Sequence, residues 1–196
     1  IAPGEILGVV GESGAGKSLT GASIIGLLEP PGRVAGGQII LEGQRIDNLP
    51  AEKMRHIRGK QIGAIFQDPL TSLNPLYSIG RQLVETIQTH LPVSAAQARQ
   101  RAIQLLQDTG IPAAEQRIDH YPHQFSGGMR QRVVIALALA AEPKLIVADE
   151  PTTALDVSIQ AQIIQLLKRV CREHGAAVML ITHDMGVIAE TCDRVA

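Results

Sequence analysis

The chain has 196 residues, and its 18 Lys and Arg against 19 Asp and Glu give a formal net charge of −1. This near-neutral balance argues against sequence-blind nucleic-acid binding, which needs an excess of basic residues to displace counterions. With two Phe, two Tyr and no Trp, a base-stacking platform is hard to build. Hydrophobic residues make up 45% of the chain, which excludes a disordered protein and predicts an aliphatic core in one compact domain or two small lobes.

The two ends of the chain predict a fragment of a longer protein, truncated at both ends. Residue 1 is Ile rather than Met, and the chain stops inside an apolar stretch at Val195 and Ala196. The longest unbroken apolar run, residues 133–141, is far shorter than the roughly 20 residues that span a bilayer. We therefore expect no membrane-spanning helix in this part of the protein.

Strand and helix signals alternate in the first third of the chain. An apolar stretch runs into a glycine-rich turn, and the helical stretch after that turn is stopped by Pro30 and Pro31. Further on, apolar residues alternate around Gly43, as in a β-hairpin. The predicted elements here are a strand at 5–10, a helix at 17–28, a hairpin at 36–46 and a buried strand at 61–66.

The rest of the chain begins with a long helical stretch at about 79–110. Its clearest helix starts at the N-cap Ser94 and ends before Gly110. Helices and strands then alternate again: a helix at 127–141, a strand at 145–148, a helix capped by Ser158 and ended by Gly175, and a strand at 177–181. Continuously apolar strands that alternate with helices predict a mostly parallel sheet covered on both faces. Ligands of such sheets bind at the carboxyl ends of the strands.

The glycine-rich turn matches a phosphate-binding pattern: Gly, any four residues, Gly, Lys, and Ser or Thr. Glycines let consecutive backbone N–H groups point at phosphate oxygens, and the helix that follows adds its positive N-terminal dipole. The ammonium of Lys17 can reach the β- and γ-phosphates, and the hydroxyl of Ser18 can ligate Mg²⁺. We expect nucleotide contacts from Gly11, Glu12, Ser13, Gly14, Ala15, Gly16, Lys17, Ser18 and Leu19.

A pair of carboxylates follows the apolar strand at 145–148. Asp149, at the end of this strand, can hold Mg²⁺ directly or through water. The adjacent Glu150 points in a different direction and can polarise an attacking water. An acidic pair after a strand is usually only a solvated turn, so this interpretation depends on the phosphate-binding turn in the same chain.

Between these two motifs, Ser126-Gly127-Gly128 precedes a helical stretch. Here the chain resembles the ATP-binding cassette (ABC) ATPase family, whose signature is Leu-Ser-Gly-Gly-Gln, and the order of the motifs matches that family over essentially the whole chain. The resemblance implies an α/β fold: a P-loop NTPase core with a mostly parallel sheet, a small antiparallel β subdomain and an inserted α-helical subdomain. The predicted boundaries are 1–196 for a single ABC ATPase domain, 1–76 and 143–196 for the core with the β subdomain, and 77–142 for the helical subdomain with the signature.

The resemblance also implies ATP and Mg²⁺ as cofactors and roles for individual residues. Gln67 resembles the glutamine that senses Mg²⁺ and the γ-phosphate, and His183 resembles the histidine that holds water and the γ-phosphate in line with Glu150. The signature at 126–128 is expected to cap the γ-phosphate of ATP bound to a partner subunit, and Asp156 to contact the partner's phosphate-binding turn. The implied catalytic residues are Glu150, His183 and Gln67; the implied Mg²⁺ ligands are Ser18, Gln67 and Asp149; the implied nucleotide contacts add Ser126, Gly127, Gly128 and Asp156.

Four longer stretches, at 66–75, 121–132, 148–156 and 182–187, resemble the bacterial oligopeptide and dipeptide importer ATPases. This resemblance implies ATP hydrolysis coupled to peptide uptake by a peripheral subunit on the cytoplasmic face of the bacterial inner membrane. The implied partners are a second ATP-binding cassette subunit, identical or different, transmembrane permease subunits and, indirectly, a solute-binding protein, with no nucleic acid. Nickel or glutathione import stays open as an alternative, and so does a soluble ABC-type ATPase without a permease.

Two departures from the family pattern stand out. Met129 occupies the position where the signature has Gln, so a side-chain amide is missing next to Ser126. The family usually stacks adenine on an aromatic residue upstream of the phosphate-binding turn, and no aromatic residue precedes Gly11 here. We expect that aromatic residue to precede Ile1, so adenine specificity does not follow from these residues.

Overall fold

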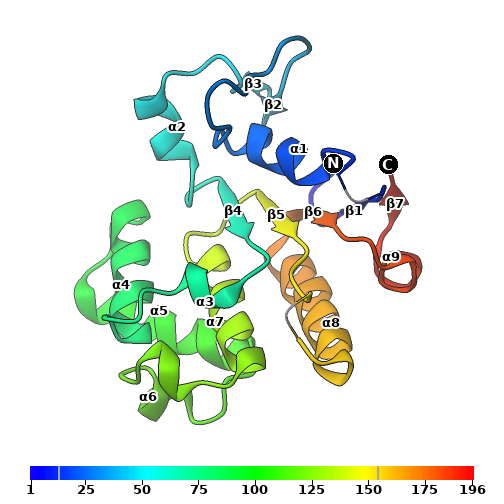
Figure 1. The fold of residues 1–196 in the computed structure, drawn as a ribbon. Coiled ribbons are helices and arrows are strands. Elements are labelled where there is room, and N and C mark those ends of the chain that lie inside the picture. The colour runs from blue at the N-terminus through cyan, green and yellow to red at the C-terminus, as the bar shows by residue number, and fades with distance from the viewer. Residues whose placement is uncertain (13, 154) are drawn as a thin grey trace.

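The computed structural model describes residues 1–12, 14–153 and 155–196. Figure 1 shows strands that form a central sheet, a helix on either side of it, and a separate group of helices beside one of its edges. The elements in chain order are β1 (Ile6–Val9), α1 (Lys17–Ile24), β2 (Ile40–Leu41), β3 (Gln44–Arg45), α2 (Ala51–Ile57), β4 (Ile62–Ile65), α3 (Pro69–Ser72), α4 (Ile79–His90), α5 (Ala95–Asp108), α6 (Ala114–Arg117), the 3₁₀ helix η1 (Pro122–Gln124), α7 (Gly127–Leu139), β5 (Leu145–Asp149), α8 (Val157–His174), β6 (Ala177–Ile181), α9 (Met185–Thr191) and β7 (Arg194–Val195).

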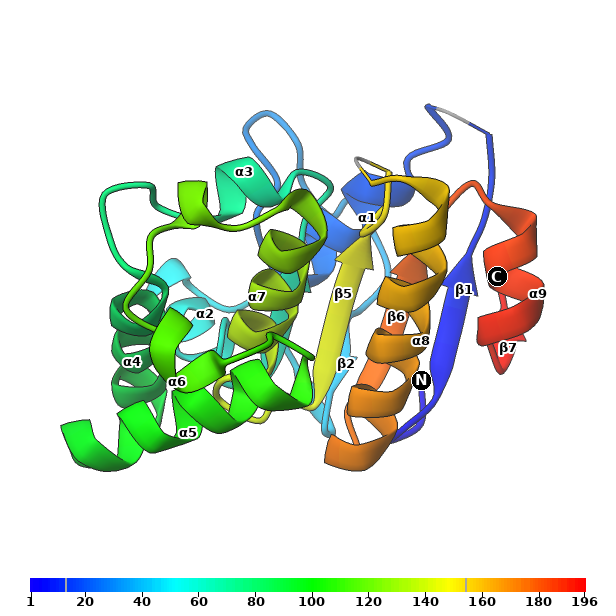
Figure 2. The ribbon, with the colours of Figure 1, turned by 90° about the horizontal axis from the view of Figure 1, so that it is seen from below.

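Five strands form one parallel sheet in the order β4-β5-β6-β1-β7, and β2 and β3 form a separate antiparallel hairpin. Near the carboxyl ends, Ile65 of β4 pairs with Ala148 of β5, and Val9 of β1 pairs with Ile181 of β6. Because the strands run parallel, the loops that follow them leave the sheet at the same edge (Figure 2). The mostly parallel sheet and the small antiparallel element predicted from the sequence are confirmed.

Helices cover both faces of the sheet, as the uninterrupted apolar strands predict (Figure 1). Successive strand residues point to opposite faces, so β1, β4, β5 and β6 each contribute to two hydrophobic clusters. One cluster joins residues such as Ile146 to α7 and α8. On the other face, a Cβ on Gly21 of α1 would lie 3.1 Å from side-chain atoms of both Val147 and Ile181. Helix α1 therefore lies directly on β5 and β6, which brings its N-terminus to the carboxyl edge of the sheet.

Helices α4, α5 and α6 lie together to one side of the sheet (Figure 1). Their apolar residues Leu83, Ile87 and Leu106 are fully buried and belong to the same hydrophobic cluster as the sheet face under α8. One core therefore extends from the sheet into this group of helices. The division into a core and a helical subdomain, with boundaries at 77 and 142, stays a prediction.

Several predicted turns and helix ends are confirmed. Ser94 caps α5 through a capping box, the Ser126 hydroxyl caps α7, and Gly175 ends α8 in the left-handed conformation. The predicted hairpin is present with strands of two residues each. Its turn, Glu42-Gly43, has positive φ angles of 51° and 78°, the combination that a type I′ hairpin turn requires.

Two predicted helix ends are wrong. The helix predicted to be capped by Ser158 begins one residue before that serine, because Asp156 adopts the extended backbone of an N-cap residue. Ser158 therefore lies inside the first turn. The helix after the glycine-rich turn ends at Ile24 rather than at Leu28, because Gly26 takes a left-handed φ of 67°.

The close packing of α7 on β4 gives a stability prediction. A Cβ on Gly63 of β4 would lie 2.5 Å from the backbone carbonyl oxygen of Ala138, which cannot move without shifting α7. We expect Gly63→Ala to lower the free energy of unfolding by about 1–3 kcal/mol, as overpacking does elsewhere. Gly36→Ala is the matched control, because no atom lies within 4 Å of its added Cβ. Urea unfolding of both variants tests this, and equal stabilities would contradict the close approach.

Candidate nucleotide-binding site

The turn between β1 and α1 has the backbone geometry of an anion-binding loop. Gly14 and Gly16 take left-handed φ angles of 83° and 91°, which residues with a Cβ rarely adopt. Gly16 is also the N-cap of α1, so the unpaired N–H groups at the start of that helix face the turn. The side chain of Lys17 folds back over the turn, where its Nζ donates hydrogen bonds to the carbonyl oxygens of Gly11 at 2.8 Å and Glu12 at 2.9 Å.

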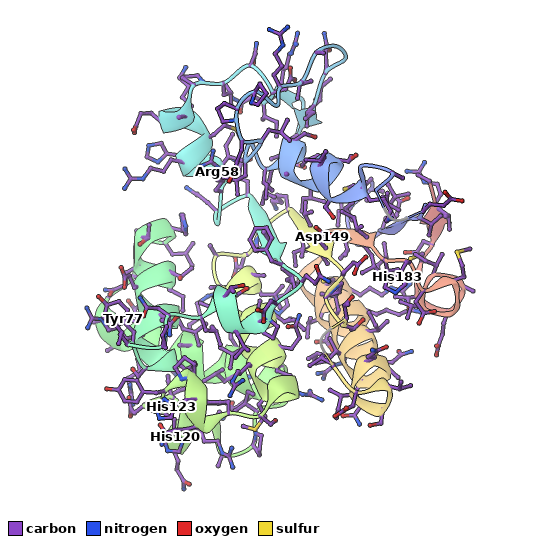
Figure 3. The ribbon with its side chains drawn as sticks, viewed as in Figure 1. Arg58, Tyr77, His120, His123, Asp149 and His183 are labelled. Carbon is purple, nitrogen blue, oxygen red and sulfur yellow. The ribbon has the colours of Figure 1, made fainter. Side chains whose placement is uncertain are left out.

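A cavity of about 500 Å³ opens beside this turn. It combines the first turn of α1 with residues that follow β5 and β6, and Figure 3 shows Asp149 and His183 at the same end of the sheet. The described residues that line it are Gly14, Gly16, Lys17, Ser18, Leu19, Glu150 and His183. Of the other predicted contacts, Gly11, Glu12 and Ala15 belong to the turn, and Ser13 lies outside the described residues.

Ser18 and Asp149, 131 positions apart in sequence, meet beside this cavity. The Ser18 hydroxyl donates a hydrogen bond to Oδ1 of Asp149 at 3.1 Å. Burial raises the pKa of Asp149, and the hydrogen bond from Ser18 opposes that rise. A hydroxyl and a carboxylate are hard oxygen ligands of the kind that Mg²⁺ prefers, so this pair fits a magnesium ion.

The carboxylate of Glu150 is in contact with two predicted site residues. Its Oε1 lies 3.2 Å from Nδ1 of His183, and its Oε2 accepts a long hydrogen bond of 3.4 Å from the Gln67 amide. Gln67, predicted as a Mg²⁺ ligand, therefore contacts Glu150 in this structure. Burial raises the pKa of Glu150, but hydrogen bonds from Thr153 and His183 and the charge of Lys17 outweigh it and leave the pKa below its ordinary value. Glu150 is thus ionised at neutral pH and can accept a proton.

The predicted signature residues do not line this cavity in the described part of the chain. Ser126 caps α7, and its hydroxyl accepts a hydrogen bond from the N–H of Met129 at 3.3 Å. Gly127 is exposed, whereas a Cβ on Gly128 would lie 2.8 Å from Ile159 of α8. Gly128 therefore has a packing role between α7 and α8 in addition to any role toward a ligand.

Two further details of the signature and of the segment before α8 were not available from the sequence. The sulfur of Met129, which stands in place of the family's Gln, lies 3.6 Å from the Arg117 guanidinium. Asp156 is the N-cap residue of α8, and Ala154, two positions before it, lies outside the described residues. The expected contacts of Asp156 with a partner subunit stay a prediction.

Thr153 is a polar residue of the site that the sequence patterns did not indicate. Its hydroxyl donates a hydrogen bond of 2.8 Å to Oε2 of Glu150, the shortest contact to that carboxylate among the described residues. The available signal was weak: a hydroxyl residue three positions after Glu150, in a turn that contains Pro151.

Comparison with known proteins finds relatives over nearly the whole chain. Residues 1–153 match the family described as ABC transporter. The chain is 53% identical over 194 residues to the oligopeptide transport ATP-binding protein OppD of Bacillus subtilis, which aligns with 98% of this chain and 54% of the relative. It is 49% identical over 192 residues to the dipeptide transport ATP-binding protein DppD of Escherichia coli, with 98% of this chain and 59% of the relative covered. The chain thus spans little more than half the length of these relatives.

Solved structures show the same fold. The dimeric post-hydrolysis state of the ATP-binding cassette MJ0796, bound to ADP and Pi, superimposes with a TM-score of 0.84 at 33% identity, covering 100% of this chain and 81% of that one. CbiO1 of Clostridium perfringens, part of the ABC transporter complex cbiONQ, superimposes with a TM-score of 0.82 at 31% identity, covering 98% and 72%. These matches confirm the predicted fold and imply a nucleotide-binding cassette. The chain belongs to the ABC transporter family.

Proposed function

We propose that this chain is the ATP-binding and ATP-hydrolysing part of a bacterial ABC importer for dipeptides or oligopeptides. The observation that carries the proposal is the cavity in which a phosphate-binding turn, a lysine ammonium and an ionised glutamate beside a histidine meet. Nucleotide binding needs the turn and Lys17, whereas hydrolysis needs Glu150 as well. A non-hydrolysing nucleotide-binding module would not require Glu150 and the neighbouring His183.

Binding of ATP would depend mainly on the backbone of the turn. The N–H groups at 14–18 and the positive end of the α1 dipole favour the phosphates, and Lys17 adds a full positive charge. In the present structure Lys17 donates to the carbonyl oxygens of Gly11 and Glu12. Phosphate oxygens, which are charged acceptors, form stronger hydrogen bonds with an ammonium than neutral carbonyl oxygens do. We therefore expect Lys17 to turn toward the phosphates when ATP binds.

Ser18 and Asp149 would hold Mg²⁺, with Gln67 as a third ligand. When bound, Mg²⁺ neutralises charge that develops on the β- and γ-phosphates. The described residues include no group of three or more His, Cys, Asp or Glu side chains that could hold a metal ion. The pair formed by Ser18 and Asp149 suits Mg²⁺, which proteins commonly hold through one or two carboxylates together with substrate phosphates and water.

Hydrolysis would use Glu150 as the general base. Its carboxylate accepts a proton from water while the water oxygen attacks the γ-phosphorus and the bond to the bridging oxygen of ADP breaks. His183, within 3.2 Å of Glu150 and largely exposed toward the cavity, is suited to orient the water and the γ-phosphate. Positioning and charge stabilisation, rather than covalent chemistry, would supply most of the rate enhancement.

A second cassette would complete the site. Because the signature at 126–128 lies away from the cavity of its own chain, its exposed helix N-terminus is available to a nucleotide held by another subunit. MJ0796, a structural neighbour, is described as a dimeric cassette. We infer the same sandwich here, with Asp156 beside the partner's turn.

A transmembrane permease is the second kind of partner that we propose. No helix in the described part of the chain is long and apolar enough to cross a membrane. As a transporter subunit it would lie peripherally on the cytoplasmic face of the inner membrane, with residues 67–77 transmitting closure to permease subunits that receive peptide from a solute-binding protein. Peptides are favoured over nickel or glutathione because the curated relatives are named for oligopeptide and dipeptide transport.

The test measures phosphate release from ATP by the intact protein, and peptide uptake by its complete transporter. We expect hydrolysis with Mg²⁺ and loss of at least about 100-fold in rate with excess EDTA, because the developing phosphate charge is then not neutralised. Restoring Mg²⁺ should restore the rate. Peptide uptake that requires ATP supports the peptide assignment. ATP hydrolysis without any peptide uptake, but with uptake of nickel or glutathione, would overturn the substrate class alone.

A further inference from the structure

Three side chains contact the carboxylate of Glu150, and the three contacts differ in length. The Thr153 hydroxyl donates to Oε2 at 2.8 Å, whereas the Gln67 amide reaches the same oxygen only at 3.4 Å. Nδ1 of His183 lies 3.2 Å from Oε1, and the His183 side chain is 64% exposed. The contact from Thr153 is therefore the shortest, and its geometry lies well within the range of a good O–H···O hydrogen bond.

Thr153 comes from the same turn as Glu150, so its position relative to that carboxylate is tightly restricted. The N–H of Thr153 donates to the carbonyl oxygen of Glu150 at 3.3 Å, which closes the turn. Within it, the ring of Pro151 restricts φ, and Thr152 is buried, with 8% of its surface exposed. Because Thr is β-branched, its χ1 has few accessible rotamers. The backbone and side-chain contacts therefore fix the hydroxyl beside Oε2.

This inference rests on the proposed function, in which Gln67 and His183 also bind groups other than Glu150. Gln67 is assigned to Mg²⁺ and His183 to the γ-phosphate, so both side chains are drawn toward the ligands during turnover. Thr153 is not among the described residues that line the cavity, and no such task competes for its hydroxyl. It can keep the carboxylate oriented while Gln67 and His183 change partners.

We propose that Thr153 is a positioning residue for hydrolysis, which holds Oε2 of Glu150 so that the carboxylate stays aimed at the attacking water. It contacts Glu150 rather than the substrate, so it is not itself a catalytic residue. The side chain of Thr153 is exposed, so a change there leaves no buried cavity and its effect on stability is small. Its loss should lower kcat and leave the affinity for ATP unchanged.

The test compares Thr153→Val, which keeps the shape and removes the hydroxyl, with Thr153→Ser, which keeps the hydroxyl. Thr89→Val is the matched control, because the exposed Thr89 loses a similar hydrogen bond, to the carbonyl oxygen of Glu85, on α4. At saturating Mg²⁺ and ATP, the intact protein with Thr153→Val should show a kcat about tenfold lower with an unchanged KM. Thr153→Ser should recover most of kcat, and Thr89→Val should equal the unchanged protein. If Thr153→Val does not fold, Thr153→Ala removes the same hydroxyl.

Several results would overturn the proposal. One is a normal kcat for Thr153→Val; another is an equal loss in Thr153→Val and Thr153→Ser, which would point to packing. A raised KM with an unchanged kcat would assign Thr153 to binding instead. In the Glu150→Gln background, Thr153→Val should cause little additional loss, and a full additional tenfold loss would show that it acts independently of Glu150. A fully active Glu150→Gln protein would instead refute the general base of the proposed function, which separates the two failures.

Discussion

Lys17→Ala is expected to lose ATP binding, with an affinity at least about 100-fold below that of the unchanged protein, because each hydrogen bond from an ammonium to a charged phosphate oxygen is worth about 1.5–3 kcal/mol. Among the described residues that line the cavity, Lys17 is the only Lys or Arg. The remaining positive potential comes from backbone amides, which are partial charges. Removing the ammonium therefore removes the largest positive charge that the described lining side chains bring to the triphosphate.

Titration with a fluorescent ATP analogue and calorimetry with ATP measure this loss. Lys53→Ala, on the exposed side of α2, removes a lysine away from the cavity and should bind ATP normally. Because Lys17 also donates to the carbonyl oxygens of Gly11 and Glu12, a melting curve must accompany the titration. A folded Lys17→Ala protein that retains its affinity would contradict the assignment of this turn to phosphate binding.

Glu150→Gln is expected to bind ATP but to hydrolyse it about 10²–10⁴-fold more slowly, the usual contribution of a general base. The amide has nearly the same shape as the carboxylate, and its oxygen can still accept the hydrogen bond from Thr153. It cannot take up a proton from water at neutral pH. ATP should therefore remain intact between two subunits, and the protein should accumulate as an ATP-bound dimer.

Phosphate release under single-turnover conditions gives the rate, and size-exclusion chromatography with and without ATP gives the oligomeric state. Glu173→Gln, near the exposed end of α8, makes the same chemical change away from the cavity and should behave as the unchanged protein. Near-normal turnover by Glu150→Gln would exclude this carboxylate as the base. Lys17→Ala and Glu150→Gln together separate binding from hydrolysis, since the first should lose both and the second only hydrolysis.

Much of the fold could be predicted because its signals are local. The buried strand at 177–181 is predicted with the bounds it has, because a short apolar run between a glycine and a polar residue leaves little choice. Ser94 and Gly175 mark helix ends through capping chemistry that involves only their own neighbours. The phosphate-binding turn is equally local, since its glycines, Lys17 and the start of α1 lie within eight positions.

Other elements could not be predicted, for physical reasons. Helix α9 and strand β7 are short and depend on their packing against β1: Gly8 of β1 leaves room for Ile188 and Cys192, and β7 pairs only at Leu7 and Gly8. The end of α1 at Ile24 depends on a left-handed glycine rather than on the prolines further along the chain. Marginal elements of this kind are decided by tertiary contacts rather than by propensity.

The sequence by itself determined the α/β class, the phosphate-binding turn, the carboxylate pair and, through its resemblance, the family. Only the tertiary structure decided how these groups meet. The Glu150 carboxylate is brought to Gln67 and His183, which are 83 and 33 positions away, by the order of β4, β5 and β6 in the sheet. The left-handed φ of 46° at Glu150 and the hydroxyl of Thr153 then set its direction. A sequence pattern identifies the chemical groups, but distances between them depend on strand order and on turns closed by long-range packing.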